Sequence, residues 1–305
     1  MRSSRTTTEG GGRGLLAEYK RGLKSVAVEE LFDLVFYRPL AFLFVKLICR
    51  TGVTPNQLTF LSMVFGILGG VSLALGTPGA LVAGAVFFLL YNIVDCSDGQ
   101  LARLNHSGTP LGRILDGVAD YVVSLAAYLG IGIGFAGASD RPILMWVLTA
   151  AAGFSNAAQS GLLDFYRNRF LDATGVRKSV LVEEQKALRE EYEGLRGRKG
   201  MRLEKFLIGT YLLYSRVQQR LTGERGTVAQ PLTGDSAEYV RANRVLMHCW
   251  TYLGPTTQWT LLVVCAFCGR LDIYLWGIAG VGNILAVIMM LVQRWNNGHL
   301  AVQGG

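Results

Sequence analysis

Long apolar segments constrain the fold of this chain more than any other feature. A helix needs about 20 predominantly apolar residues to cross the hydrocarbon core of a bilayer. Only 17% of the 305 residues are charged, whereas soluble domains carry about 25%. We therefore predict an all-α, polytopic membrane protein with six transmembrane helices, preceded by an interfacial amphipathic helix. The expected spans are about 57–76, 80–104, 110–136, 142–163, 246–268 and 271–293.

The segments outside these spans divide the chain into regions. Residues 1–13 are polar and rich in Gly, Ser and Thr, which predicts a disordered tail. Residues 14–50 alternate charged and apolar positions but hold no stretch long enough to span, so they form an interfacial, juxtamembrane helical region. Residues 51–305 form the six-span domain. A cytoplasmic helical insertion at 164–244 interrupts it, with helices expected at about 180–195 and 201–221.

Basic residues predict the orientation of the chain. Lys and Arg are concentrated in the N-terminal region, the 103–113 connection, the 164–244 segment and the end of the last span. By the positive-inside rule, both termini are cytoplasmic. The net charge of +8 suits anionic lipid headgroups or a polyanionic substrate. It does not indicate nucleic acid, because the basic residues flank apolar spans and no nucleic-acid-binding motif is present.

Four aspartates lie at the expected cytoplasmic ends of the second and third spans, where a charge is costly. Asp95 and Asp98 are three residues apart, and Asp116 and Asp120 are four apart, so each pair shares one helical face. A short connection makes the two helices antiparallel neighbours, and the pairs then face each other across a cleft. Four carboxylates form an all-oxygen site of the kind that selects Mg²⁺ or Mn²⁺.

Small residues accompany the aspartates. Gly99 follows Asp98 directly, Ala102 lies about one turn further on, and Gly112 lies one turn before Asp116. Together they leave room for a ligand to approach the backbone, although packing between helices also favours small residues. Arg103 supplies a cation suited to phosphate.

In this arrangement the sequence resembles a known family, the CDP-alcohol phosphotransferases (the CDP-alcohol phosphatidyltransferase superfamily). All eight residues of the family signature are present at the family's spacing. They read Asp95-x2-Asp98-Gly99-x2-Ala102-Arg103-x8-Gly112-x3-Asp116-x3-Asp120. The segment Thr54-Pro55-Asn56-Gln57-Leu58-Thr59 is similar to the one that opens the family's first span.

The resemblance implies an enzyme of phospholipid biosynthesis. Asp95, Asp98 and Asp116 would hold one or two Mg²⁺ or Mn²⁺ ions that bridge the diphosphate of a CDP-linked donor, and Asp120 would complete the metal site. Asp120 would also be the general base that takes the proton from the hydroxyl of an alcohol acceptor. That hydroxyl would attack the β-phosphorus of the donor, and CMP would leave. The nucleotide would be lined by Gly99, Ala102, Arg103, Thr109, Gly112, Asn56 and Thr59.

Two orientations of the reaction fit the same motif. Either a phosphatidyl group passes from CDP-diacylglycerol to a small alcohol, or a CDP-linked head group passes to a lipid or polyol acceptor. Basic residues at the cytoplasmic ends of the later spans are candidate acceptor contacts, although positive-inside anchoring also explains them. These are Arg167, Arg169, Arg241, Arg244 and Arg294.

Alternatives from other classes fit less well. A metal-ion transporter would need polar residues at mid-bilayer depth in several spans, whereas these acids cluster at one end. A non-catalytic scaffold would not require all four. Dimers are common in the family that the chain resembles, and the apolar faces of the later spans allow a homodimer.

Overall fold

A computed structural model describes Tyr19 and residues 28–174, 193–194, 209 and 236–303. Apart from isolated residues, the predicted tail and the helices expected at 180–195 and 201–221 lie outside this part of the chain. Every element described is helical. The α-helices are α2 (Arg38–Ile48), α3 (Pro55–Ala74), α4 (Pro78–Leu104), α5 (Pro110–Ala138), α6 (Pro142–Ala173), α9 (Ser236–Thr251), α10 (Pro255–Phe267), α11 (Leu271–Trp276) and α12 (Asn283–Gln303). Two π-helical segments, η1 (Asp33–Tyr37) and η2 (Gly277–Gly282), continue into α2 and α12.

A repeated Thr-Pro pair starts three of the long helices. Thr54, Thr77 and Thr109 are the N-cap residues of α3, α4 and α5, and each side chain accepts a hydrogen bond from the backbone N–H three residues on. Proline follows at the first helical position, where its missing N–H leaves no hydrogen bond unmade. The helix starts are thus encoded locally.

Four helical stretches are long and apolar enough to cross a membrane, which makes this a multi-pass membrane protein. They are Pro55–Ala74, Pro78–Leu104, Ile114–Ala138 and Leu271–Asn297. The first three and the last correspond to the expected first, second, third and sixth spans. Helix α6 is also long, with 32 residues, but polar side chains such as Asn156 and Gln159 interrupt its apolar middle.

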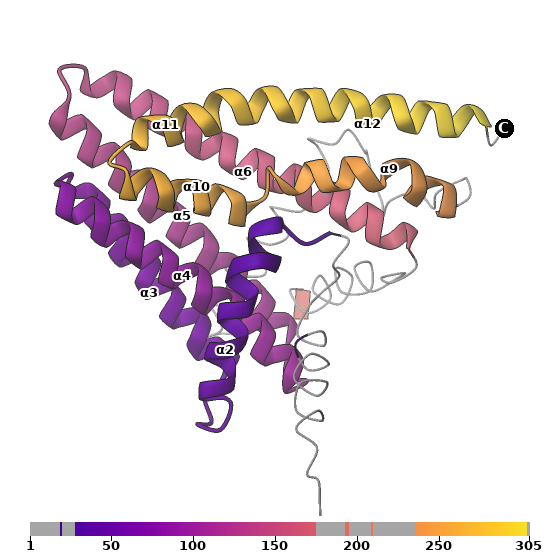
Figure 1. Cartoon of the computed structure of the whole chain (residues 1–305), viewed down its shortest axis with the longest axis horizontal. Coiled ribbons are helices and arrows are strands. Elements are labelled where there is room, and N and C mark those ends of the chain that lie inside the picture. Colours follow the sequence, from indigo (N-terminus) through magenta and orange to yellow (C-terminus); the bar gives the residue numbers. More distant parts are fainter. Residues whose placement is uncertain (1–18, 20–27, 175–192, 195–208, 210–235, 304–305) are drawn as a thin grey trace, which may run out of the picture.

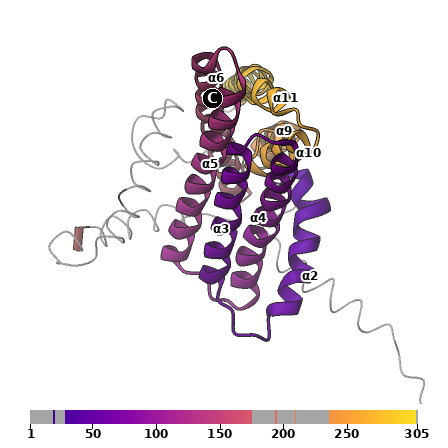
Figure 2. The ribbon, with the colours of Figure 1, turned by 90° about the vertical axis from the view of Figure 1, so that its left-hand side faces the viewer.

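Helices α3, α4 and α5 form a bundle in which α3 contacts both of the others, and α2 lies against α4 (Figure 2). Glycines bring α3 and α5 together: a Cβ on Gly70 would overlap the carbonyl of Ala126, and a Cβ on Gly130 would overlap that of Gly70. Small residues allow such close approach between membrane helices. The aspartate-bearing α4 and α5 are thereby held around a common partner.

The expected fifth span, at about 246–268, is interrupted: the chain there forms two helices, α9 and α10. Helix α9 ends at Thr251 and α10 begins at Pro255. A proline ring collides with the carbonyl four residues earlier and cannot continue a helix smoothly. The two helices follow roughly one line below α11 and α12 in Figure 1. At 13 residues, α10 alone is shorter than a membrane crossing requires.

The fourth span also differs, because α6 continues to Ala173 rather than ending near residue 163. Buried amides join it to the C-terminal helices. Gln159 Nε2 donates to the Ile278 carbonyl in η2, at 3.0 Å, and Gln258 Nε2 on α10 donates to Gln159 Oε1, also at 3.0 Å. Burying these polar groups is tolerated because they satisfy one another.

Candidate active site

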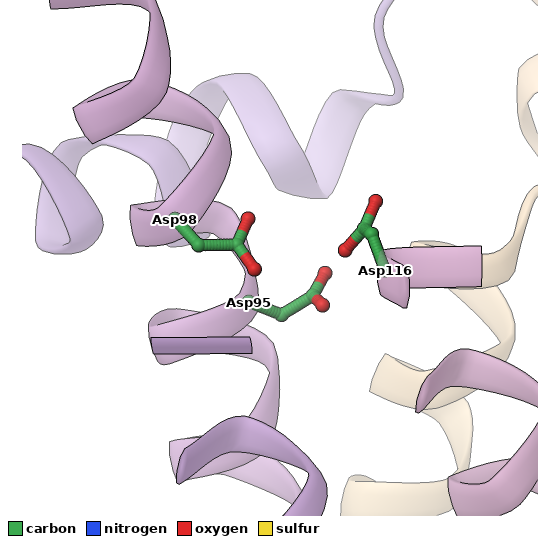
Figure 3. Close-up of side chains that lie close together, drawn as sticks. All are labelled: Asp95, Asp98 and Asp116. Atoms are coloured by element: carbon green, nitrogen blue, oxygen red, sulfur yellow. The ribbon is translucent and has the colours of Figure 1, made fainter. Parts of the chain in front are cut away.

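Three of the four aspartates converge between α4 and α5. Asp95, Asp98 and Asp116 each offer a carboxylate oxygen, and these oxygens all lie within 4.8 Å of one another. Figure 3 shows the two carboxylates of α4 pointing toward the one on α5. Asp95 Oδ1 is buried and has no hydrogen-bond partner among the described residues. A hard oxygen set with an orphaned buried acceptor fits a divalent cation, so these three residues can hold one.

Thr59, which the sequence suggested as a nucleotide contact, touches the aspartate cluster in this structure. Its hydroxyl on α3 donates to Asp98 Oδ2 at a distance of 2.5 Å, and both side chains are buried. An outer hydrogen bond of this kind fixes the direction of a metal-binding carboxylate. Helix α3 therefore contributes to the cluster without supplying a carboxylate.

Asp120 is not one of the three converging carboxylates. It lies one turn further along α5 than Asp116, and its Oδ1 accepts a hydrogen bond from the Tyr91 hydroxyl at 2.7 Å. Asp120 and Asp95 both line a cavity of about 310 Å³ enclosed by α4, α5, α6 and α10. The cavity thus begins at the aspartates and extends toward the C-terminal helices.

Several polar side chains line part of this cavity, among apolar ones. Tyr121 and Asp164 line it together with Asn156, Ser160 and Thr256. The Ser160 hydroxyl oxygen is buried and has no hydrogen-bond partner among the described residues. These side chains offer hydrogen-bonding groups to a ligand in the cavity.

The other signature residues lie on α4 and α5, the helices that carry the aspartates. A Cβ on Gly99 would lie 3.3 Å from Arg103 Nη1, so the guanidinium folds back over the glycine. A Cβ on Gly112 would lie 3.1 Å from both Asn56 Oδ1 and Thr109 Oγ1. Thr109 is the N-cap of α5, and Ala102 is half-buried on α4. The structure therefore brings Gly112, Asn56 and Thr109 together at the start of α5.

The five arginines expected at the acceptor site are placed differently from one another. Arg167 pairs with a residue of the cavity wall: its Nη1 lies 3.7 Å from Oδ1 of Asp164, which lines the cavity. Arg169 lies on the same helix, α6. Arg241 and Arg244 on α9 and Arg294 on α12 are exposed and are not among the residues that line the cavity.

A buried charged cluster ahead of α2 was not predicted from the sequence. Glu29, Glu30, Asp33 and Arg38 are all buried. Glu29 pairs with Arg38 at 2.7 Å, and Glu30 lies 3.8 Å from Arg167. The residues look like ordinary surface charges of an interfacial helix, and only their tertiary partners bury them.

Burial in this cluster raises the pKa values of two of its acids. Burial, reinforced by the charge of Asp33, raises the pKa of Glu30 to about 8, against the favourable effects of Arg167 and Thr257. Burial also raises the pKa of Asp33. These acids therefore bind protons more readily than exposed carboxyl groups do.

Comparison with known proteins agrees with this site. Residues 52–169, which contain all four aspartates, match the family model for CDP-alcohol phosphatidyltransferase. Through this segment, which is less than half of its length, the chain is similar to that family. Helices α9 to α12 lie beyond the matched residues.

Curated relatives share the same part of the chain. Phosphatidylinositol phosphate synthase of Corynebacterium glutamicum is 39% identical over 83 residues, which is 27% of this chain and 37% of the relative. The bifunctional IPC transferase and DIPP synthase of Rubrobacter xylanophilus is 32% identical over 125 residues, 41% of this chain and 26% of the relative. Phosphatidylinositol phosphate synthase of Mycolicibacterium smegmatis is 32% identical over 108 residues, which is 35% of this chain and 46% of the relative. The matches span less than half the length of these relatives.

Proposed function

We propose that the chain transfers a phosphatidyl-type group from a CDP-activated lipid, such as CDP-diacylglycerol, to an alcohol acceptor and releases CMP. The observation that carries this proposal is the convergence of Asp95, Asp98 and Asp116 beside a cavity that Asp120 also lines. A Mg²⁺ or Mn²⁺ ion held by the three aspartates would neutralise the diphosphate of the donor and stabilise the leaving phosphate. Gly99 and Gly112 leave room for the nucleotide, and Arg103 faces its phosphates.

The acceptor occupies the cavity beside Asp120. Its O–H bond breaks as the proton passes to Asp120, its oxygen forms a bond to the β-phosphorus, and the bond to CMP breaks. Arg167, beside Asp164 at the cavity wall, is the best placed of the five arginines to meet a phosphorylated acceptor. The names of the relatives support an inositol phosphate as that acceptor. The second candidate is transfer of a CDP-linked head group to a lipid or polyol acceptor.

In the membrane, we place α3, α4, α5, α6, the α9–α10 pair and the continuous helix from Leu271 as six spans. The distribution of Lys and Arg supports cytoplasmic termini and an active site at the cytoplasmic surface. A soluble acceptor and a lipid-linked nucleotide meet there.

The test is CMP release from purified protein, supplied in turn with CDP-diacylglycerol and with CDP-linked head groups. We expect CMP only with the lipid donor and only with a divalent ion present. Asp120→Asn should lower kcat by about 10²–10⁴-fold, whereas the exposed Asp140→Asn should leave it unchanged. Wild-type activity in excess chelator, or in Asp120→Asn, would contradict the proposal.

A further inference from the structure

The carboxylate of Asp120 is held from one side by a buried phenol. The Tyr91 hydroxyl donates to Asp120 Oδ1 at 2.7 Å, across the α4–α5 interface. Tyr91 is only 2% exposed and lies one helical turn before Asp95 on α4. Both Tyr91 and Asp120 line the cavity, so the hydrogen bond lies where the acceptor is expected.

Tyr91 is itself fixed by an aromatic contact from α10. Its ring meets Trp259 edge to face, with centroids 5.3 Å apart, and Trp259 stacks on Phe88 of α4 at 5.2 Å. Such pairs favour one defined geometry of the rings. Trp259 lies outside the segment that matches the family model, so a C-terminal helix holds a residue that contacts the predicted base.

To act as the base, the Asp120 carboxylate must direct one of its oxygens toward the acceptor hydroxyl. The terminal torsion of an aspartate is broad, so an unsupported carboxylate samples many orientations. A hydrogen bond that fixes Oδ1 also fixes the direction of Oδ2. Misplacement of a reacting group by about 1 Å lowers rates by roughly 10²-fold.

We propose that Tyr91 is a positioning residue for Asp120, and that Trp259 on α10 acts through Tyr91. With Oδ1 engaged by the phenol, Asp120 Oδ2 receives the acceptor proton as the new O–P bond forms and CMP departs. This inference rests on the proposed function, because it assigns Asp120 the role of base. It adds a residue outside the eight-residue signature to the machinery of the site.

The test compares two Tyr→Phe variants of the full-length protein. Tyr91→Phe removes the phenol donor and keeps the ring against Trp259. Tyr274→Phe is the matched control, because Tyr274 is equally buried at 1% exposure but its hydroxyl lies 2.8 Å from that of Tyr128. We expect Tyr91→Phe to lower kcat by about 10–100-fold, with unchanged KM for the CDP donor and unchanged Mn²⁺ affinity. Tyr274→Phe should retain wild-type kcat.

A double-mutant cycle separates positioning from a general structural role. If Tyr91 acts through Asp120, then Tyr91→Phe should cause no further loss in an Asp120→Asn background, because interacting residues are not additive. Additive losses would overturn the proposal, as would wild-type kcat in Tyr91→Phe or an equal loss in Tyr274→Phe. Failure of the wild-type protein to release CMP from any CDP donor would instead overturn the proposed function.

Discussion

Glu30, in the segment before η1, caps the N-terminus of α10 across more than 200 residues of sequence. Its Oε2 accepts hydrogen bonds from the backbone N–H of Thr257, at 2.8 Å, and from the Thr257 hydroxyl, at 3.1 Å. A Cβ on Gly254 would overlap the Glu30 carboxyl group, so the helix start leaves space for it. The break between α9 and α10 is therefore also a docking point for the N-terminal segment.

This contact predicts a dependence of stability on pH. The pKa of Glu30 is raised from 4.5 to about 8 by burial, so the folded protein holds this proton more tightly than the unfolded chain does. Stability is thus highest below pH 4.5 as far as Glu30 is concerned, and it declines as pH rises toward about 8. We expect Glu30→Gln, which keeps an acceptor for Thr257, to show a smaller decline in unfolding midpoint between pH 5 and 8. An unchanged decline, equal to that of the control Asp140→Asn, would contradict this.

The hydrogen bond from Thr59 to Asp98 should contribute to metal affinity. Thr59→Val keeps the shape of the side chain and removes the donor. Outer hydrogen bonds to metal ligands are typically worth about 10–100-fold in affinity, so we expect a loss of that size in Mn²⁺ titrations. Thr149→Val is the control, because the buried Thr149 hydroxyl has no hydrogen-bond partner among the described residues. Equal affinities in the two variants would show that Thr59 does not orient Asp98.

Ser160 should contribute to acceptor recognition. Its buried hydroxyl lines the cavity without a partner among the described residues, and a neutral hydrogen bond contributes about 0.5–1.5 kcal/mol. We expect Ser160→Ala to raise the KM for the acceptor by about 2–10-fold while leaving the KM for the donor unchanged. Ser72→Ala, which loses only a hydrogen bond within α3, should change neither value. A rise in the donor KM alone would place Ser160 at the nucleotide instead.

The contact between α3 and α5 should tolerate no added methyl group at Gly70. A Cβ there would overlap the Ala126 carbonyl, and overpacking of this kind costs about 1–3 kcal/mol. We expect Gly70→Ala to lower the unfolding midpoint in detergent. Gly79→Ala, where a Cβ would meet nothing within 4 Å, is the matched control. Equal midpoints would show that the two helices separate easily.

Local patterns in the sequence determined the helices and most of the aspartate site. Apolar runs and the Thr-Pro starts predicted α3, α4 and α5, because span length and helix capping depend on neighbouring residues. The spacing of Asp95 and Asp98 placed both on one helical face, and the short connection to α5 predicted Asp116 opposite them. The same pattern placed Asp120 in this set, whereas the structure brings only the first three together.

Tertiary structure decided the features that depend on distant partners. Pro255 is the local cause of the break between α9 and α10. Hydropathy alone does not reveal this break, because the segments on both sides of the proline are largely apolar. Three contacts are of this kind: Glu30 with Thr257, Thr59 with Asp98, and Tyr91 with Asp120. Each joins segments that are distant in sequence, so the periodicity within one helix does not predict it. The sequence by itself determined which carboxylates gather at one end of the bundle. Only the packing of α3, α6 and α10 around them decided which side chains surround Asp120, because those contacts depend on how the helices lie against one another.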